Sequence, residues 1–243
     1  MIRAVVLITE PRHGLRRTAE VIRGAALALG PDRLVVQLRD KAASPAALLD
    51  VARALRGVTR DVRAQLIING SPSVARAVGA DGVHLPSEAG AAPATLASRI
   101  AAAREWLGRE AVVTTAAHDD AEVRAALEAG ATAALVSPIF ASPGKGPARG
   151  VAALASARAI VDASRRSPRL LVYALGGVTR ARAPDCANAG ADGVAVIRAL
   201  YHPAEPAGVE PAGASKVGAV ALGLAAAFAP QGTSAVAARR GGC

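Results

Sequence analysis

Gly79-Ala80-Asp81-Gly82-Val83-His84-Leu85 recurs along this chain as Gly190-Ala191-Asp192-Gly193-Val194-Ala195-Val196. A weaker copy stands at residues 130–136. Each copy joins a glycine of the kind that ends a helix to a tight turn and an apolar strand. The copies begin at residues 79, 130 and 190, so each interval has room for about two βα units. The repeat therefore predicts a parallel sheet with crossover helices.

Short apolar runs alternate with alanine-rich helical stretches over most of the chain. Eight such βα units in 243 residues predict an α/β fold, a closed (β/α)8 TIM barrel, with its site on the loops that follow the strands. The alternative is an open doubly wound sheet, which is disfavoured because Thr9-Glu10-Pro11-Arg12 stands where a glycine-rich dinucleotide turn is expected. The predicted strands are Ala4–Ile8, Leu34–Arg39, Gln65–Asn69, Gly82–Leu85, Ala111–Thr115, Ala133–Ser137, Leu170–Leu175 and Gly193–Ile197. Predicted helices include Pro45–Arg60, Pro93–Leu107, Asp119–Ala129 and Val151–Arg165.

One domain is expected over residues 1–201, the barrel itself. The stretch from His202 to Pro211 is rich in proline, glycine and alanine and indicates a linker. A last helix is expected near Ala214–Ala229, followed by a basic tail. Linker, helix and tail together make up residues 202–243.

Composition and charge exclude several classes of protein. The net charge is +10 with a pI near 11.0, but the arginines are spread singly and aromatic residues are only 2%, so we expect no nucleic-acid partner. Val217–Ala229 is apolar but too short to span a bilayer, and Ala4–Ile8 suits a first strand better than a signal peptide. Cys186, expected to be buried, and Cys243 form no disulfide framework. We expect a cytoplasmic protein with no membrane partner.

Two cations follow the second predicted strand, within Gln37-Leu38-Arg39-Asp40-Lys41. On an extended strand Arg39 and Lys41 point to the same side. Only three of the 29 Lys+Arg residues are lysines, so the presence of Lys41 indicates a position that needs a compact ammonium. We expect both cations to bind phosphate. The alternative is a strand end in which Asp40 pairs with them.

Further strand-end loops carry residues suited to an anion. The loop Ser137–Gly146 is long, rich in glycine and proline, and contains Lys145, which is typical of a loop that closes over a ligand. Gly176-Gly177 lets backbone N–H groups approach an anion, and with Ile197-Arg198 it occupies the usual phosphate site of this barrel class. Asn69 suits a ligand contact and a plain turn equally.

Taken in this order, the motifs resemble the thiamine-phosphate synthase and thiazole tautomerase superfamily over about residues 4–200. The resemblance implies a transferase of thiamine biosynthesis that joins a hydroxymethylpyrimidine pyrophosphate to a thiazole phosphate and releases pyrophosphate. Its implied partners are phosphorylated small molecules, and a homo-oligomer is left open. The resemblance rests on Gln37–Lys41, Ile67–Asn69, Gly79–Leu85, Ser137–Phe140 with Lys145, Ala174–Val178 and Gly190–Ile197.

Residue roles follow from the resemblance alone. Catalytic roles on the leaving pyrophosphate fall to Arg39, Lys41 and Lys145. Gln37 and Ser137 are implied to contact the pyrimidine, and Asn69 to lie beside the pyrophosphate. The residues implied to bind the thiazole phosphate are Ser142, Gly176, Gly177, Ile197 and Arg198.

The metal-binding positions depart from the synthase pattern. The synthases carry two magnesium-binding aspartates where this chain has Gly70 and Ala89. Glu88, one residue earlier, is therefore the candidate metal ligand, and magnesium is the expected cofactor.

Two alternatives stay open beside a synthase. The tautomerases carry a histidine in loop six where this chain has Pro138, so loop six favours the synthases, whereas His84-Leu85-Pro86-Ser87 resembles the tautomerase branch. A thiazole phosphate isomerase would need His84, Glu88 or His118 as its acid or base. A non-catalytic binder of thiazole or thiamine phosphate needs neither the metal nor the acid.

Overall fold

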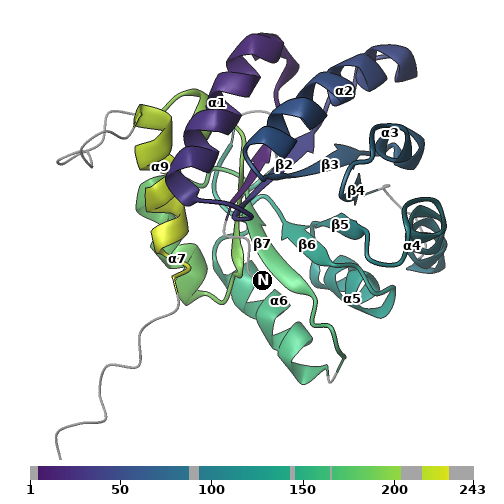
Figure 1. The fold of residues 1–243 in the computed structure, drawn as a ribbon. Helices are drawn as coiled ribbons and strands as arrows, with labels where there is room; N and C mark the ends of the chain where they lie inside the picture. Colours follow the sequence, from purple (N-terminus) through teal and green to yellow (C-terminus); the bar gives the residue numbers. More distant parts are fainter. Residues whose placement is uncertain (1–4, 88–92, 143–145, 165, 204–214, 230–243) are drawn as a thin grey trace, which may run out of the picture.

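The computed structural model describes residues 5–87, 93–142, 146–164, 166–203 and 215–229. Eight parallel strands close into a barrel in which each strand pairs with the next one along the chain, and β8 pairs with β1. Figure 1 shows the strands at the centre and the helices around them. The predicted TIM barrel is confirmed, and the open doubly wound sheet is wrong because the sheet has closed.

The strands and helices alternate along the chain as predicted. The strands are β1 Val5–Ile8, β2 Leu34–Leu38, β3 Gln65–Asn69, β4 Gly82–Leu85, β5 Val112–Ala117, β6 Ala133–Val136, β7 Leu171–Leu175 and β8 Gly193–Val196. The α-helices are α1 Gly14–Leu29, α2 Pro45–Asp61, α3 Pro72–Val78, α4 Pro93–Leu107, α5 Asp120–Glu128, α6 Ala152–Ala163, α7 Ala183–Asn188, α8 Arg198–Tyr201 and α9 Lys216–Ala226, with 3-10 turns η1 Pro11–His13 and η2 Arg180–Arg182.

The repeated turn that predicted the fold has the same structural task in its two copies that carry an aspartate, at Asp81 and Asp192. Asp81 Oδ2 accepts hydrogen bonds from the backbone N–H of Leu66 and from Arg56, both within 2.8 Å. Asp192 does the same for the N–H of Val172 and for arginines of the neighbouring elements. The carboxylate therefore satisfies the first free donor of the adjacent strand, which a buried turn requires.

Side chains alternate along each strand, so that they contribute in turn to two separate hydrophobic cores. The barrel interior is filled by Val6, Ile8, Val35, Ile67, Ala133, Leu135, Tyr173 and Ala195, and the outward-facing residues pack under the helices. Cys186 is fully buried in the outer core, as expected, and burial raises the pKa of its thiol to about 11.

The last helix, predicted near Ala214–Ala229, is α9, and it packs against α1 (Figure 1). Gly24 of α1 and Gly218 of α9 face each other, and a Cβ on Gly218 would lie 3.1 Å from the Cβ of Ala28. Small residues thus let the two helices approach closely. No helix among the described residues has both the length and the apolarity to cross a membrane.

Candidate active site

Four of the predicted site residues lie at the carboxyl-terminal mouth of the barrel. Each stands two positions beyond a residue of the barrel interior: Gln37 after Val35, Asn69 after Ile67, Ser137 after Leu135 and Ile197 after Ala195. Strand alternation directs Gln37 and Asn69 into the mouth. Ser137 and Ile197 directly follow the last residues of β6 and β8, and Ile197 packs against the interior core. The sequence reasoning therefore named residues that the barrel brings together.

Gln37 and Asn69 are joined directly. Gln37 Nε2 donates a hydrogen bond to Asn69 Oδ1 at 3.2 Å, while Gln37 itself is 1% exposed. The other amide atom, Gln37 Oε1, is buried and has no hydrogen-bond partner among the described residues. A buried acceptor without a partner costs free energy of folding. Such an atom is typical of a position that contacts a ligand.

Arg39 and Lys41 lie beyond the end of β2 rather than on it. The predicted strand Leu34–Arg39 ends at Leu38, so the alternation argument does not reach these two cations. The backbone N–H of Arg39 donates to Thr9 Oγ1 at 3.0 Å, and Arg39 is half-buried, whereas Lys41 is exposed. Asp40 accepts from the backbone N–H groups of the next turn instead of forming a strand-end ion pair with its neighbours.

His84 lies on the interior face of β4, opposite Asn69 in the strand register. Its Nδ1 is 2.9 Å from Thr114 Oγ1, and the residue is 5% exposed. Burial, together with the positive charges of Arg39 and Arg99, lowers the pKa of His84 to about 3. The imidazole is therefore neutral at any ordinary pH.

His118 is the histidine that reaches the mouth. Its Nδ1 lies 3.0 Å from the carbonyl oxygen of Ser137 and 3.3 Å from Ser137 Oγ. Its own backbone N–H donates to Glu122 Oε2, and Glu122 Oε1 accepts from Ser87 Oγ, each at 2.5 Å. Glu122, which sequence reasoning did not single out, thus links the loops after β4 and β5.

The two glycines after β7 make room for loop six, the segment between β6 and α6. Gly176 has φ +101° and Gly177 has φ +61°, which glycine adopts at little cost. A Cβ on Gly177 would lie 2.7 Å from the carbonyl oxygen of Ala141 and 2.8 Å from the Cβ of Phe140. The glycines therefore permit both an anion-binding backbone and close contact between the two loops. Ser142 Oγ is 3.5 Å from the carbonyl oxygen of Phe140 in the same loop.

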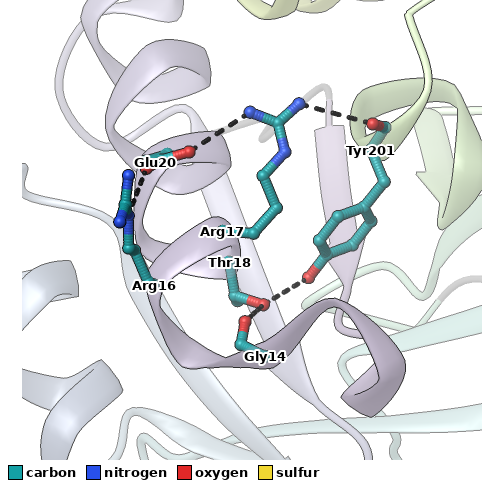
Figure 2. A network of polar contacts seen from close by, with 6 residues as sticks. All are labelled: Gly14, Arg16, Arg17, Thr18, Glu20 and Tyr201. Carbon is teal, nitrogen blue, oxygen red and sulfur yellow. Dashed lines mark hydrogen bonds and ion pairs between the residues drawn. The ribbon is translucent and has the colours of Figure 1, made fainter.

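Helix α8, which begins at Arg198 directly after Ile197, is fixed to α1 (Figure 2). Thr18 Oγ1 lies 2.8 Å from the carbonyl oxygen of Gly14 and 2.9 Å from the Tyr201 hydroxyl. Because the single hydroxyl hydrogen of Thr18 is used on Gly14, Tyr201 donates to Thr18. Arg17 Nη2 caps the carbonyl of Tyr201 at 3.4 Å. These contacts hold the segment expected to bind phosphate.

Three predicted positions, Lys145, Glu88 and Ala89, lie outside the described residues. Within the described ranges no group of three histidine, cysteine, aspartate or glutamate side chains could hold a metal ion. Gly70, where the synthases carry an aspartate, adds no ligand, and its N–H donates to the carbonyl of His84 at 2.8 Å.

A cavity of about 750 Å³ opens at the other end of the barrel. It is lined by the first residues of several strands, such as Gln65, Val112 and Ala133, and by the αβ turns. The amino-terminal end of this fold serves stability rather than chemistry, so this cavity is separate from the site.

The fold is a (β/α)8 barrel with amide, hydroxyl and cationic residues at its carboxyl-terminal mouth and a Gly-Gly loop before β8. These features define a class of barrels that bind phosphorylated small molecules. Residues 5–200 match the family model TMP-TENI, thiamine monophosphate synthase. The chain belongs to this family.

Individual relatives agree with the family match. The thiamine-phosphate synthase of Moorella thermoacetica is 36% identical over 202 residues, which cover 83% of this chain and 89% of that protein. The thiamine-phosphate synthase of Methanoculleus marisnigri is 41% identical over 197 residues, or 80% of this chain and 85% of the relative. A solved structure, the thiamine phosphate pyrophosphorylase from Pyrococcus furiosus, superposes with a TM-score of 0.68 at 26% identity, covering 93% of this chain and 95% of that one.

Proposed function

We propose that this protein is a thiamine-phosphate synthase, which joins a hydroxymethylpyrimidine pyrophosphate to a thiazole phosphate with release of pyrophosphate. The observation that carries the proposal within the family is the buried Oε1 of Gln37 at the barrel mouth. It has no hydrogen-bond partner among the described residues, and Gln37 lies next to Asn69 and two positions before Arg39. An amide acceptor beside a cation suits a ligand that has both an amine and a phosphate.

The reaction breaks the bond between the pyrimidine methylene carbon and the pyrophosphate oxygen, and the oxygen keeps the electron pair. The ring nitrogen of the thiazole gives its lone pair to the methylene carbon and forms the new C–N bond. Negative charge grows on the departing oxygens, so fixed cations lower the barrier. We assign that role to Arg39, Lys41 and Lys145.

The pyrimidine ring is assigned to Gln37 and Ser137. Gln37 Oε1 has no hydrogen-bond partner among the described residues and can accept, and the exocyclic amine of an aminopyrimidine donates. With the proton on Nδ1, His118 donates to the Ser137 carbonyl and Oγ, which leaves the Ser137 hydrogen free for a ring nitrogen.

The thiazole phosphate is assigned to loops six to eight. We assign to it Ser142, the backbone of Gly176 and Gly177, and the segment Ile197-Arg198, because backbone donors and a cationic side chain suit an anion. We also assign the barrel, residues 1–201, as the catalytic domain, with residues 202–243 as an appendage.

Magnesium is the cofactor that the synthases need, and the described residues alone do not fit a site for it. Gly70 offers no carboxylate, and Glu122 is engaged by Ser87 and the His118 N–H. Glu88 is the one carboxylate that we assign to the metal, together with the oxygens of the pyrophosphate itself.

A second candidate function is isomerisation of a thiazole phosphate. It is favoured by His118, the histidine that reaches the mouth and contacts Ser137, whereas the buried neutral His84 is unsuited to it. Incubation of the purified protein with both substrates separates the candidates. Thiamine phosphate supports the synthase, isomerised thiazole without coupling supports the isomerase, and binding of thiazole phosphate with no turnover leaves a non-catalytic binder.

A further inference from the structure

Arg182, in the turn η2, contacts both loops that we assign to the thiazole phosphate. Its guanidinium carbon lies 4.7 Å from the centroid of the Phe140 ring in loop six. Its Nη1 donates a hydrogen bond to the carbonyl oxygen of Gly177 at 2.9 Å. One side chain therefore stacks on loop six and binds the backbone of loop seven.

The two loops also meet through their backbones. The N–H of Ile139 donates to the carbonyl of Leu175 at 2.9 Å, and the N–H of Phe140 donates to the carbonyl of Gly176 at 3.0 Å. Ladder-like pairing thus continues past the ends of β6 and β7. Arg182 lies at the outer end of this pairing. Beyond it, Phe140 and Ala141 pack closely over Gly177, and no further backbone hydrogen bond joins the two loops among the described residues.

The chemistry of the contact requires an arginine. A planar guanidinium can stack on an aromatic face and still direct an N–H to a carbonyl in its own plane, whereas a lysine ammonium can make one such contact as a point charge. Arg182 forms no ion pair with a carboxylate in the part of the chain that the structure describes. Its positive charge therefore stays available to the anion-binding loop.

We propose that Arg182 is a positioning residue that clamps Phe140 of loop six onto Gly177 of loop seven, so that the pocket for the thiazole phosphate is formed before the substrate arrives. Preformed contacts lower the cost of ordering the loops on binding. The role in the pocket rests on the proposed function, and the clamp itself does not.

Hydrogen exchange of the Ile139 and Phe140 amides measures the clamp directly. We expect faster exchange in Arg182→Ala and in Phe140→Leu, and no rescue in Arg182→Lys. Arg16→Ala is the matched control, since it removes an equal charge from an exposed side chain of α1. The clamp also predicts that the KM for thiazole phosphate rises roughly fivefold in Arg182→Ala with little change in kcat.

The outcomes distinguish the clamp itself from its role in the pocket for the thiazole phosphate. Unchanged exchange in both Arg182→Ala and Phe140→Leu would overturn the clamp, and faster exchange with unchanged KM would overturn its role in the pocket. If the wild-type chain neither couples nor binds thiazole phosphate, the proposed function fails while exchange still decides the clamp. If the KM of the Arg182→Ala/Phe140→Leu double variant exceeds the wild-type KM by the product of the two single fold-changes, the two residues act independently and a shared contact is contradicted.

Discussion

Gln37 Nε2 donates to Asn69 Oδ1 at 3.2 Å across the ends of β2 and β3. Gln37 Oε1 is buried at the barrel mouth and has no hydrogen-bond partner among the described residues. A buried acceptor in this place suits the exocyclic amine of the pyrimidine, which is the contact that we propose for Gln37.

Replacing Gln37 by leucine tests that contact. We expect Gln37→Leu to raise the KM for the pyrimidine pyrophosphate about tenfold, because one buried hydrogen bond to the substrate is lost. The KM for thiazole phosphate should hardly change. Steady-state kinetics with each substrate varied in turn checks this, and an equal rise in both KM values would show that the variant merely disturbs the mouth.

Arg39→Ala and Lys145→Ala test the stabilisation of the leaving pyrophosphate. Each should lower kcat about 100-fold or more with the fold intact, because a fixed charge next to the departing oxygens is removed. Circular dichroism reports the fold and product formation reports kcat. Unchanged turnover in either variant removes that residue from the assigned machinery.

His84 makes stability depend on pH. Its pKa is about 3 in the folded protein and near 6.5 when unfolded, so the unfolded chain binds the extra proton first. The contribution of the neutral His84 to the free energy of unfolding is fully present above pH 6.5. It falls as the pH drops toward 3, by up to about 1.4 kcal/mol per pH unit.

Urea unfolding of the wild type and of His84→Asn, which keeps a polar partner for Thr114, measures this dependence. The stability difference between the two proteins should shrink as the pH is lowered from 7 to 4. A difference that stays constant over this range would mean that His84 titrates normally.

Restoring the two aspartates tests the metal argument. Gly70→Asp with Ala89→Asp should raise magnesium-dependent coupling, because it returns the carboxylates of the synthase pattern. Gly70 has φ +71°, a conformation that aspartate tolerates at moderate cost, and its Cβ would meet nothing nearer than Pro86 at 4.0 Å. Magnesium titrations that show no gain over the parent protein would contradict this account.

The fold and the mouth residues were accessible from the sequence because both follow from short-range patterns. The Gly-Ala-Asp turn repeats, and strand alternation places Gln37 and Asn69 on one side. The sequence indicates His118 only as one of three candidate acids or bases. The strand predicted as Ala111–Thr115 in fact continues to Ala117, which makes His118 the first residue of the loop.

The sequence could not reveal contacts that depend on how loops meet. Arg182 follows the Gly-Gly pair by a few residues, but nothing in its neighbours indicates that Phe140, far earlier in the chain, lies under its guanidinium. Glu122 likewise joins Ser87 to His118 only through folding. The neutral state of His84 depends on burial and on Arg39 and Arg99, which periodicity does not report.

The most direct test of the central claim is a balanced assay of the purified protein with both substrates, with and without magnesium, in which thiamine phosphate and released pyrophosphate are measured together. The account predicts that the two products appear in equal amounts and that Arg39→Ala suppresses both. Pyrophosphate without thiamine phosphate, or neither product at any magnesium concentration, would contradict the assignment as a synthase.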